Sequence, residues 1–431
     1  MDARWRTALI LVVLCVVAYL GNGRYLPLPL GGDTIPNRLI PFSILRFGTV
    51  TLEPFRGPLE NAHTVLWYTR TARGKLISVY PIGGAIAALP FYVPSYAFLA
   101  LCGWTTPSLL LRASARAEKY ASAMMTALAV GAFYLTVRRR LAARQAFWFA
   151  IAFGLGSLMW ASASQMLWQQ TVVAFCVTFA LWFLTWPHSS AWPSAAAGAF
   201  LGVAVATRPS AGLFLLAGLA TLIVRRRNPL WFIAASIPPI AFTFAVSWYF
   251  VGSTSGIYDA YLPRLLRDIV TLQRTAGIAG LLVSPNRGLL IYTPIAILGI
   301  WGLVKSRDPL LISFGLASLV HLILFGSFEF WYGGSAFGPR YLVDILPVLG
   351  LGAADVWNRL PSWVRRAAIP ALAWSVLVEI IGVICYPSSN WFGLNAPRWQ
   401  AAVWEWSNFS LWQDFHTWLQ SSYWVAPWGP T

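Results

Sequence analysis

The chain has 431 residues, of which 58% are apolar and 10% are charged, and its formal net charge is +17. Soluble domains carry about 25% charged residues, so this composition excludes an ordinary soluble globule and predicts a polytopic membrane protein. About 20 apolar residues cross a bilayer, which leads us to expect an all-α fold with about 11–13 transmembrane helices. The basic residues stand in short clusters between apolar runs, a pattern that orients membrane proteins and does not indicate nucleic-acid binding.

The first predicted element is a membrane-spanning helix over residues 7–21, preceded by Arg4 and Arg6. Basic residues stay on the cytoplasmic side, so we expect a cytoplasmic N-terminus. No cleavage pattern follows, and the helix is therefore expected to be retained. Residues 22–80 mix polar and apolar side chains and predict a long amphipathic first outer loop.

Apolar runs then recur up to residue 385, and each of them predicts a helix. They cover residues 81–103, 118–137, 145–163, 171–186, 194–207, 210–224, 229–251, 288–304, 309–327, 341–356 and 367–385. The run 81–103 contains Pro81, Pro90 and Pro94 and is predicted to be broken or re-entrant. Basic clusters at 138–144, 225–227, 305–307 and 359–366 are expected to share the cytoplasmic side, which makes the runs between them hairpins.

Two parts of the chain are therefore predicted. Residues 1–385 form a transmembrane domain whose first outer loop is 22–80, and residues 386–431 form a Trp-rich extracytoplasmic tail. Indole rings prefer the membrane interface, so the tail is interpreted as an interfacial belt or, alternatively, as a platform for sugar rings. The four cysteines lie in or beside apolar runs and are interpreted as small buried hydrophobes.

The candidate chemistry lies in the predicted outer segments. The sequence has no GxxxxGK[ST] loop, no HExxH and no spaced Cys/His cluster, which argues against nucleotide hydrolysis and a cytoplasmic nucleotide-sugar site. Asp33, in GGDTIPNR, follows the first helix closely. It is interpreted as a general base for an acceptor hydroxyl or, alternatively, as a loop carboxylate paired with Arg24 or Arg38. Glu53 and Glu60 are further candidates for the base, or partners of Arg56.

These features resemble a known superfamily. The resemblance rests on an Asp shortly after the first helix, an amphipathic outer loop, and the segments RGKLISVYPIGGAIAALPFYV, SPNRGLLIYTP and WYGGSAFGPRYLVDILP. Together they look like the GT-C superfamily of membrane glycosyltransferases, which includes protein O-mannosyltransferases and lipid-A aminoarabinose transferases. Protein O-mannosyltransferases carry an Asp-Glu pair where this chain has Asp33 and Thr34.

The resemblance implies transfer of a sugar from a polyprenyl-phosphate donor to an acceptor hydroxyl of a lipid, glycan or protein, with inversion. Asp33 would be the base. The expected phosphate-binding residues are Arg340, Arg208, Lys75 and Arg287, each of which could instead be an interfacial anchor. The expected residues for sugar or acceptor binding are Glu53, Glu60, Gln169, Gln170, Trp331, Tyr332 and Tyr341.

The resemblance also implies where the protein lies in the cell. The expected location is the plasma (inner) membrane, with the active site on the extracytoplasmic face and membrane lipids as neighbours. No cofactor is indicated, although a divalent metal held by oxygen ligands from separate loops stays open. The sequence leaves two other functions open, a transporter or flippase of lipid-linked sugar and a non-catalytic protein of envelope assembly.

Overall fold

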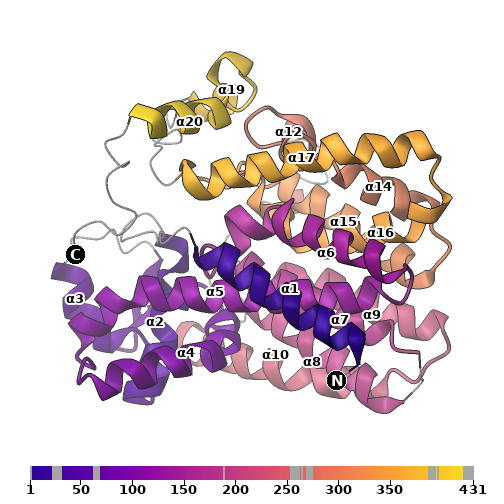
Figure 1. Cartoon of the computed structure of the whole chain (residues 1–431). Helices are drawn as coiled ribbons and strands as arrows, with labels where there is room; N and C mark the ends of the chain where they lie inside the picture. Colours follow the sequence, from indigo (N-terminus) through magenta and orange to yellow (C-terminus); the bar gives the residue numbers. More distant parts are fainter. Residues whose placement is uncertain are drawn as a thin grey trace. The chain divides into compact units, whose positions relative to one another are not determined.

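The structure, a computed structural model, describes residues 2–21, 32–61, 68–187, 190–252, 263, 266–267, 275–386, 395 and 398–420. Within these ranges the secondary structure is helical apart from one two-stranded sheet (Figure 1). The predicted all-α polytopic fold is confirmed.

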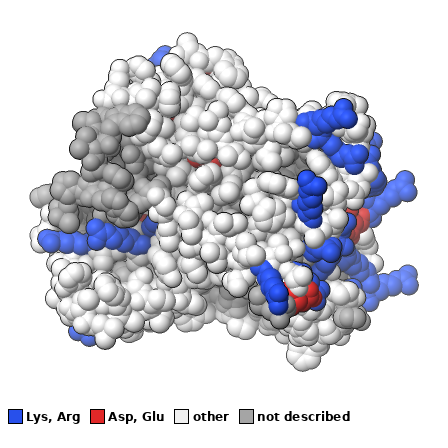
Figure 2. All heavy atoms as spheres, viewed as in Figure 1, with Lys and Arg blue, Asp and Glu red and all other residues white. Residues whose placement is uncertain are grey.

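Six described helices are long and apolar enough to cross a membrane: α1 (Ala3–Leu20), α4 (Gly83–Leu101), α5 (Pro107–Val137), α10 (Leu230–Val251), α15 (Pro309–Gly326) and α17 (Ser362–Ile384). Shorter apolar helices are α7 (Gln169–Leu184), α8 (Ala191–Thr207), α9 (Gly212–Val224) and α14 (Ala296–Lys305). Large parts of the surface in view carry no charged side chain (Figure 2). Such a surface suits lipid, because apolar residues such as Leu101, which is 89% exposed, would be unfavourable in water.

The proline-rich run 81–103 is not broken. It forms the continuous helix α4, which contains Pro90 and Pro94. Transmembrane helices tolerate proline where neighbouring helices support the backbone. The start of α4 is supported in this way, since a Cβ on Gly83 would lie 2.3 Å from the carbonyl carbon of Ala206 at the end of α8. The next run also differs from the prediction, because α5 begins at Pro107, eleven residues before the predicted 118.

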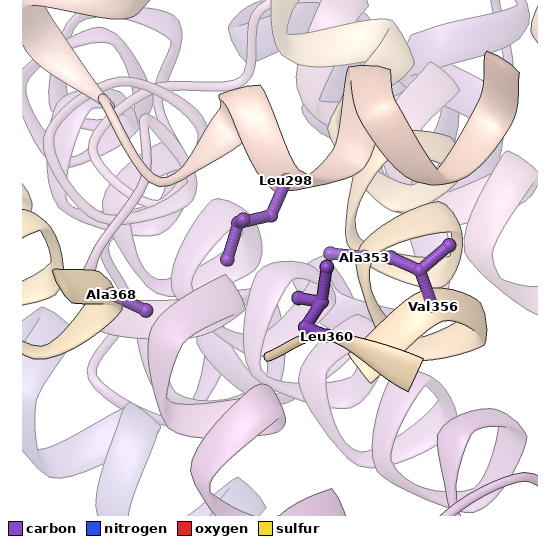
Figure 3. Packing of buried hydrophobic residues seen from close by; sticks show 5 residues of the cluster. All are labelled: Leu298, Ala353, Val356, Leu360 and Ala368. Carbon is purple, nitrogen blue, oxygen red and sulfur yellow. The ribbon is translucent and has the colours of Figure 1, made fainter. Parts of the chain in front are cut away.

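The chain divides into two compact units. Unit 1 contains Met1–Arg24, Thr126–Gln165 and Leu265–Thr431, and unit 2 contains Tyr25–Met125 and Met166–Arg264. In unit 1, Leu298 of α14 packs with Ala353 and Val356 of α16 (Leu346–Val356), with Leu360, and with Ala368 of α17 (Figure 3). Glycines bring α14 and α16 together, as in other membrane helix pairs, since a Cβ on Gly302 would lie 1.9 Å from the carbonyl oxygen of Gly352.

Charged residues join three segments at one end of unit 1. Arg140, before α6 (Ala143–Leu155), forms salt bridges with Asp308 and Asp355, and Arg359 binds Asp355 at 2.8 Å. The predicted basic clusters at 138–144, 305–307 and 359–366 thus belong to segments that meet. This agrees with the prediction that the helices between them form hairpins.

In unit 2 the predicted first outer loop contains ordered elements. They are η1 (Gly32–Thr34), α2 (Ile35–Phe47), η2 (Glu53–Phe55), α3 (Arg56–Asn61) and the strands β1 (Thr69–Ala72) and β2 (Lys75–Ser78). The strands are antiparallel, with Thr69 opposite Ser78. Arg73 and Gly74 both have positive φ angles, as the two-residue turn of a tight hairpin requires.

The remaining described elements complete both units. Unit 1 also contains the π-helical turn η3 (Met159–Ala163), α12 (Thr275–Val283), α13 (Leu289–Tyr292), η5 (Arg340–Ile345), η6 (Trp357–Arg359), α19 (Trp399–Ala402), η9 (Trp406–Asn408) and α20 (Ser410–Gln420). Unit 2 also contains η4 (Pro209–Ala211). The predicted tail therefore contributes helices to unit 1 as far as residue 420.

Candidate active site

Asp33 lies at the start of α2, in the short turn η1. Proline at position 36 favours a helix start here, and a carboxylate near a helix N-terminus is stabilised by the helix dipole. The hydroxyl of Tyr80, just after β2, donates a hydrogen bond to Asp33 Oδ1 at 3.3 Å. The side chain is only partly buried, so the carboxylate is accessible to a substrate.

Arg38 does not take the role of an Asp33 partner that the sequence suggested for it. Its Nε donates to Glu118 Oε2 at 2.6 Å, and the two side chains are only 1% and 2% exposed. Arg24, the other suggested partner of Asp33, lies outside the described residues. Glu118 lies inside α5, so this buried ion pair joins two residues that are 80 positions apart in the chain.

The same carboxylate fixes a second segment. Glu118 Oε1 accepts a hydrogen bond from the backbone N–H of Leu167 at 3.0 Å, and Asn37 Nδ2 donates to the Leu167 carbonyl at 3.1 Å. Helix α2, the first part of α5 and the segment before α7 are therefore joined by buried polar contacts. These contacts fix the direction of α2, the helix that Asp33 precedes.

Arg208 lies buried at the end of α8, where its backbone N–H donates to Ala204. Its neighbour Thr207 approaches α2, since a Cβ on Gly84 would lie 3.2 Å from both Thr207 Cγ2 and Asn37 Oδ1. The end of α8, the start of α4 and the first turn of α2 thus meet. Two further predicted residues, Gln169 and Gln170, begin α7, only two and three residues after Leu167.

Glu53 organises the hairpin of the first outer loop. It accepts hydrogen bonds from Arg56 at 3.0 and 2.8 Å and from the backbone N–H of Leu76 at 2.7 Å. The bond from Arg56, followed by that from Leu76, holds the pKa of Glu53 below its usual value, which makes it a weak base. Glu60 is exposed, 3.9 Å from Arg56, and Lys75 is exposed at the start of β2.

Unit 1 holds the other predicted cations. Arg287 is buried and donates to three carbonyls, with Nε–O 2.9 Å to Tyr332, Nη2–O 3.2 Å to Gly334 and Nη1–O 2.7 Å to Asn286. The loop that supplies two of these carbonyls turns through Gly333, Gly334 and Gly338, all with positive φ. It leads into Arg340, which is also buried, with its guanidinium carbon 5.2 Å from the Tyr341 ring centroid.

Both guanidinium-bearing residues contact the same loop. Arg287 donates to the carbonyls of Tyr332 and Gly334, and a Cβ on Gly333 would lie 3.2 Å from Arg340 Cγ. We call Arg287, Arg340 and the loop 331–340 the cation loop.

The aromatic residues of the cation loop have different environments. The Tyr332 ring centroid lies 3.5 Å from that of Trp399, and burial raises the pKa of Tyr332 to about 12, which keeps the phenol protonated. Trp331 packs on α12, since a Cβ on Gly280 would lie 2.2 Å from its ring. Tyr341 stacks on Phe325 with centroids 5.0 Å apart. No pattern in the sequence distinguishes Trp399 from the other tail tryptophans.

Among the described residues, no group of three or more His, Cys, Asp or Glu side chains is arranged to hold a metal ion. The structure provides two candidate groups of residues, Asp33 with Tyr80 and the cation loop.

Solved structures share this architecture. ArnT from Cupriavidus metallidurans bound to undecaprenyl phosphate matches over 95% of this chain and 75% of that chain, at 15% identity and a TM-score of 0.50. The chain shares the fold of this ArnT structure. Apo ArnT matches at 16% identity over 95% of this chain and 74% of that chain, with a TM-score of 0.49. The archaeal oligosaccharyltransferase AglB from Archaeoglobus fulgidus matches at 13% identity over 92% and 59%, with a TM-score of 0.47.

No family model and no curated protein sequence matches this chain. At such low identity the GT-C fold says nothing about individual side chains. The roles of Asp33 and of the cation loop must be argued from their chemistry.

Proposed function

We propose that this chain is an integral-membrane glycosyltransferase of the plasma (inner) membrane, which transfers a sugar from a polyprenyl-phosphate-linked donor to an acceptor hydroxyl on the extracytoplasmic face. The observation that carries the proposal is the accessible carboxylate of Asp33, oriented by Tyr80 at the start of a helix that buried polar contacts hold in place. The ArnT structure, which has the same fold, holds undecaprenyl phosphate, and this supports a lipid-linked donor.

The reaction needs one base. Asp33 takes the proton of the acceptor hydroxyl as its oxygen attacks the anomeric carbon, and the bond between that carbon and the phosphate oxygen breaks. Polyprenyl phosphate leaves as a stable anion, so no acid has to protonate it. A glycoside hydrolase would need a second carboxyl group at the same bond. Attack from the face opposite the leaving group inverts the anomeric carbon.

The leaving phosphate needs preorganised positive charge. Arg287 and Arg340 are assigned this role, because buried guanidinium groups bind phosphate oxygens strongly and with fixed geometry. The loop carbonyls that hold Arg287 also fix its orientation before any ligand binds. Arg208, buried beside α2, is a second candidate for this role, and exposed Lys75 is the weakest. Tyr332 and Trp399 are assigned to the sugar.

The Asp33→Asn variant tests the proposal. Loss of the base should reduce transfer by about 10²-fold or more, measured as product formed from a polyprenyl-phosphate sugar in proteoliposomes. The control is Glu60→Gln, which removes an exposed carboxylate of the same loop and should leave the rate unchanged. Equal rates for Asp33→Asn and the unmodified chain would refute the assignment of the base and favour the flippase or the assembly protein.

A further inference from the structure

The tail helix α20 has three different sides. Its side toward the protein carries Ser410, Leu411 and Asp414, which are buried. A second side carries Trp412, which is 63% exposed, and Leu419, which is 43% exposed. A third side carries the exposed polar residues His416, Thr417 and Gln420. At 100° per residue these groups occupy separate arcs of the helix.

One side of α20 departs from the pattern of a helix on a soluble protein. Ser410 and Asp414 face inward, whereas the large ring of Trp412 faces outward. Trp406, in the preceding turn η9, is also 63% exposed. Hydrophobic side chains normally face the protein and polar ones the solvent. The exposed tryptophans therefore indicate that this side of α20 does not face water.

The inward polar residues bind one segment of unit 1. The backbone N–H of Ser410 donates to Asn286 Oδ1 at 2.6 Å, and Asn286 Nδ2 donates to the Ala402 carbonyl at 2.8 Å. The Ser410 hydroxyl shares a 2.8 Å hydrogen bond with Tyr292. Asn286 directly precedes Arg287, so the tail is attached next to a residue of the cation loop.

We infer that α20 lies in the plane of the membrane, with Trp412 and Leu419 in the phospholipid headgroup and acyl boundary and with Thr417 in water. Helices of this kind have one apolar side in lipid and one polar side in solvent, and indole is the side chain that this boundary favours. The lipid-facing side continues an existing lipid contact, because α20 packs on α17, whose Leu377 and Ile384 are exposed apolar residues of a membrane-spanning helix.

The position of α20 at the membrane boundary affects binding of the donor. This step rests on the proposed function. A polyprenyl-phosphate sugar carries its phosphate at headgroup depth, between the lipid tail and the sugar. By binding both the membrane boundary and Asn286, α20 holds Arg287 at this depth. The tail thus acts as a positioning element for donor binding, and none of its residues has to take part in the reaction.

Site-directed spin labels test the depth of α20. Trp412→Cys and the matched control Thr417→Cys are labelled in a Cys102→Ser background, since Cys102 is the exposed one of the four cysteines. The protein is placed in vesicles of phosphatidylethanolamine and phosphatidylglycerol. The label at 412 should be more accessible to oxygen than to a nickel chelate, at a depth of about 5–10 Å, and the label at 417 should show the reverse order.

Two outcomes overturn the inference: a label at 412 that is more accessible to nickel than to oxygen, or one that neither reagent reaches.

A second variant tests the positioning role. Asn286→Ala should increase the mobility of the label at 412 and raise the donor KM several-fold, with a smaller change in kcat. If the label becomes mobile but the donor KM is unchanged, the positioning role of α20 is refuted. Label accessibility is measured without any transfer reaction, so a wrong depth for α20 can be distinguished from a wrong proposed function.

Discussion

Arg38 and Glu118 form a buried ion pair in unit 2, with side chains that are only 1% and 2% exposed. Burying two charges is costly, and their attraction offsets the cost only while both partners are present. Glu118 also accepts the N–H of Leu167, so it joins α2, α5 and the segment before α7. Asp33 lies in the turn just before α2. The pair thus connects the stability of unit 2 with the orientation of the proposed base.

Glu118→Ala should therefore lower the free energy of unfolding by about 3–5 kcal/mol, because the Arg38 charge stays buried without its partner. Arg38→Met combined with Glu118→Met should recover most of this loss. The measurement is thermal unfolding in one detergent. As a control, Arg359→Gln breaks a pair whose arginine is 61% exposed, and the change should stay below about 1 kcal/mol. If the double variant were as unstable as Glu118→Ala, the stranded charge would not be the cause.

Glu379 is a second buried carboxyl group, and it supports the π-helical turn η3. Its Oε2 accepts the N–H of Ala161 at 2.8 Å, while Oε1 has no hydrogen-bond partner among the described residues. Glu379→Gln keeps both the acceptor and the shape, so stability should change by less than about 1 kcal/mol. Glu379→Ala removes the acceptor and opens a cavity, at a cost of about 2–5 kcal/mol. Chemical unfolding of both variants would check this, and equal losses would contradict it.

At the scale of elements, the hairpin of β1 and β2 depends on the charge of Glu53, which joins η2 to β2 through Leu76. Because the hydrogen bonds hold the folded pKa of Glu53 below 4.5, its contribution to stability is present above that pH. It is lost as the pH falls through the folded pKa. Hydrogen exchange of Leu76 should therefore become faster on acidification in the unmodified chain, relative to Glu53→Gln. The same acid sensitivity in both chains would refute this role.

The helices show how far a single sequence predicts this fold. The runs 171–186, 194–207 and 309–327 predicted α7, α8 and α15 to within about three residues. A continuous apolar stretch satisfies its own backbone hydrogen bonds in a bilayer as a helix. Proline misled the prediction for α4, since the support at Gly83 comes from a helix that is more than 100 residues distant. The short helices and the hairpin within residues 32–80 were not predicted, because a mixed composition leaves many local structures possible.

At the scale of the whole molecule, composition predicted a polytopic membrane protein, and the resemblance predicted the GT-C fold that the comparison with ArnT supports. The candidate site was predicted only as a set of isolated residues. Its contacts join positions far apart, such as Tyr332 with Trp399 and Arg38 with Glu118, and no spacing pattern reveals them. Trp331, which packs on α12, and Trp399, which lies against Tyr332, also show that residue type alone does not predict the environment of a ring.

Arg140 has a bearing on how the protein is made. Its two acidic partners come 168 and 215 residues later in the chain, so the ribosome must synthesise all three segments before the cluster can close. Asp355 can already pair with Arg359, four residues further on, whereas its bond to Arg140 needs the distant segments to meet. Closure of this cluster is therefore a late event in membrane assembly, since it joins segments from the first and the last third of the chain.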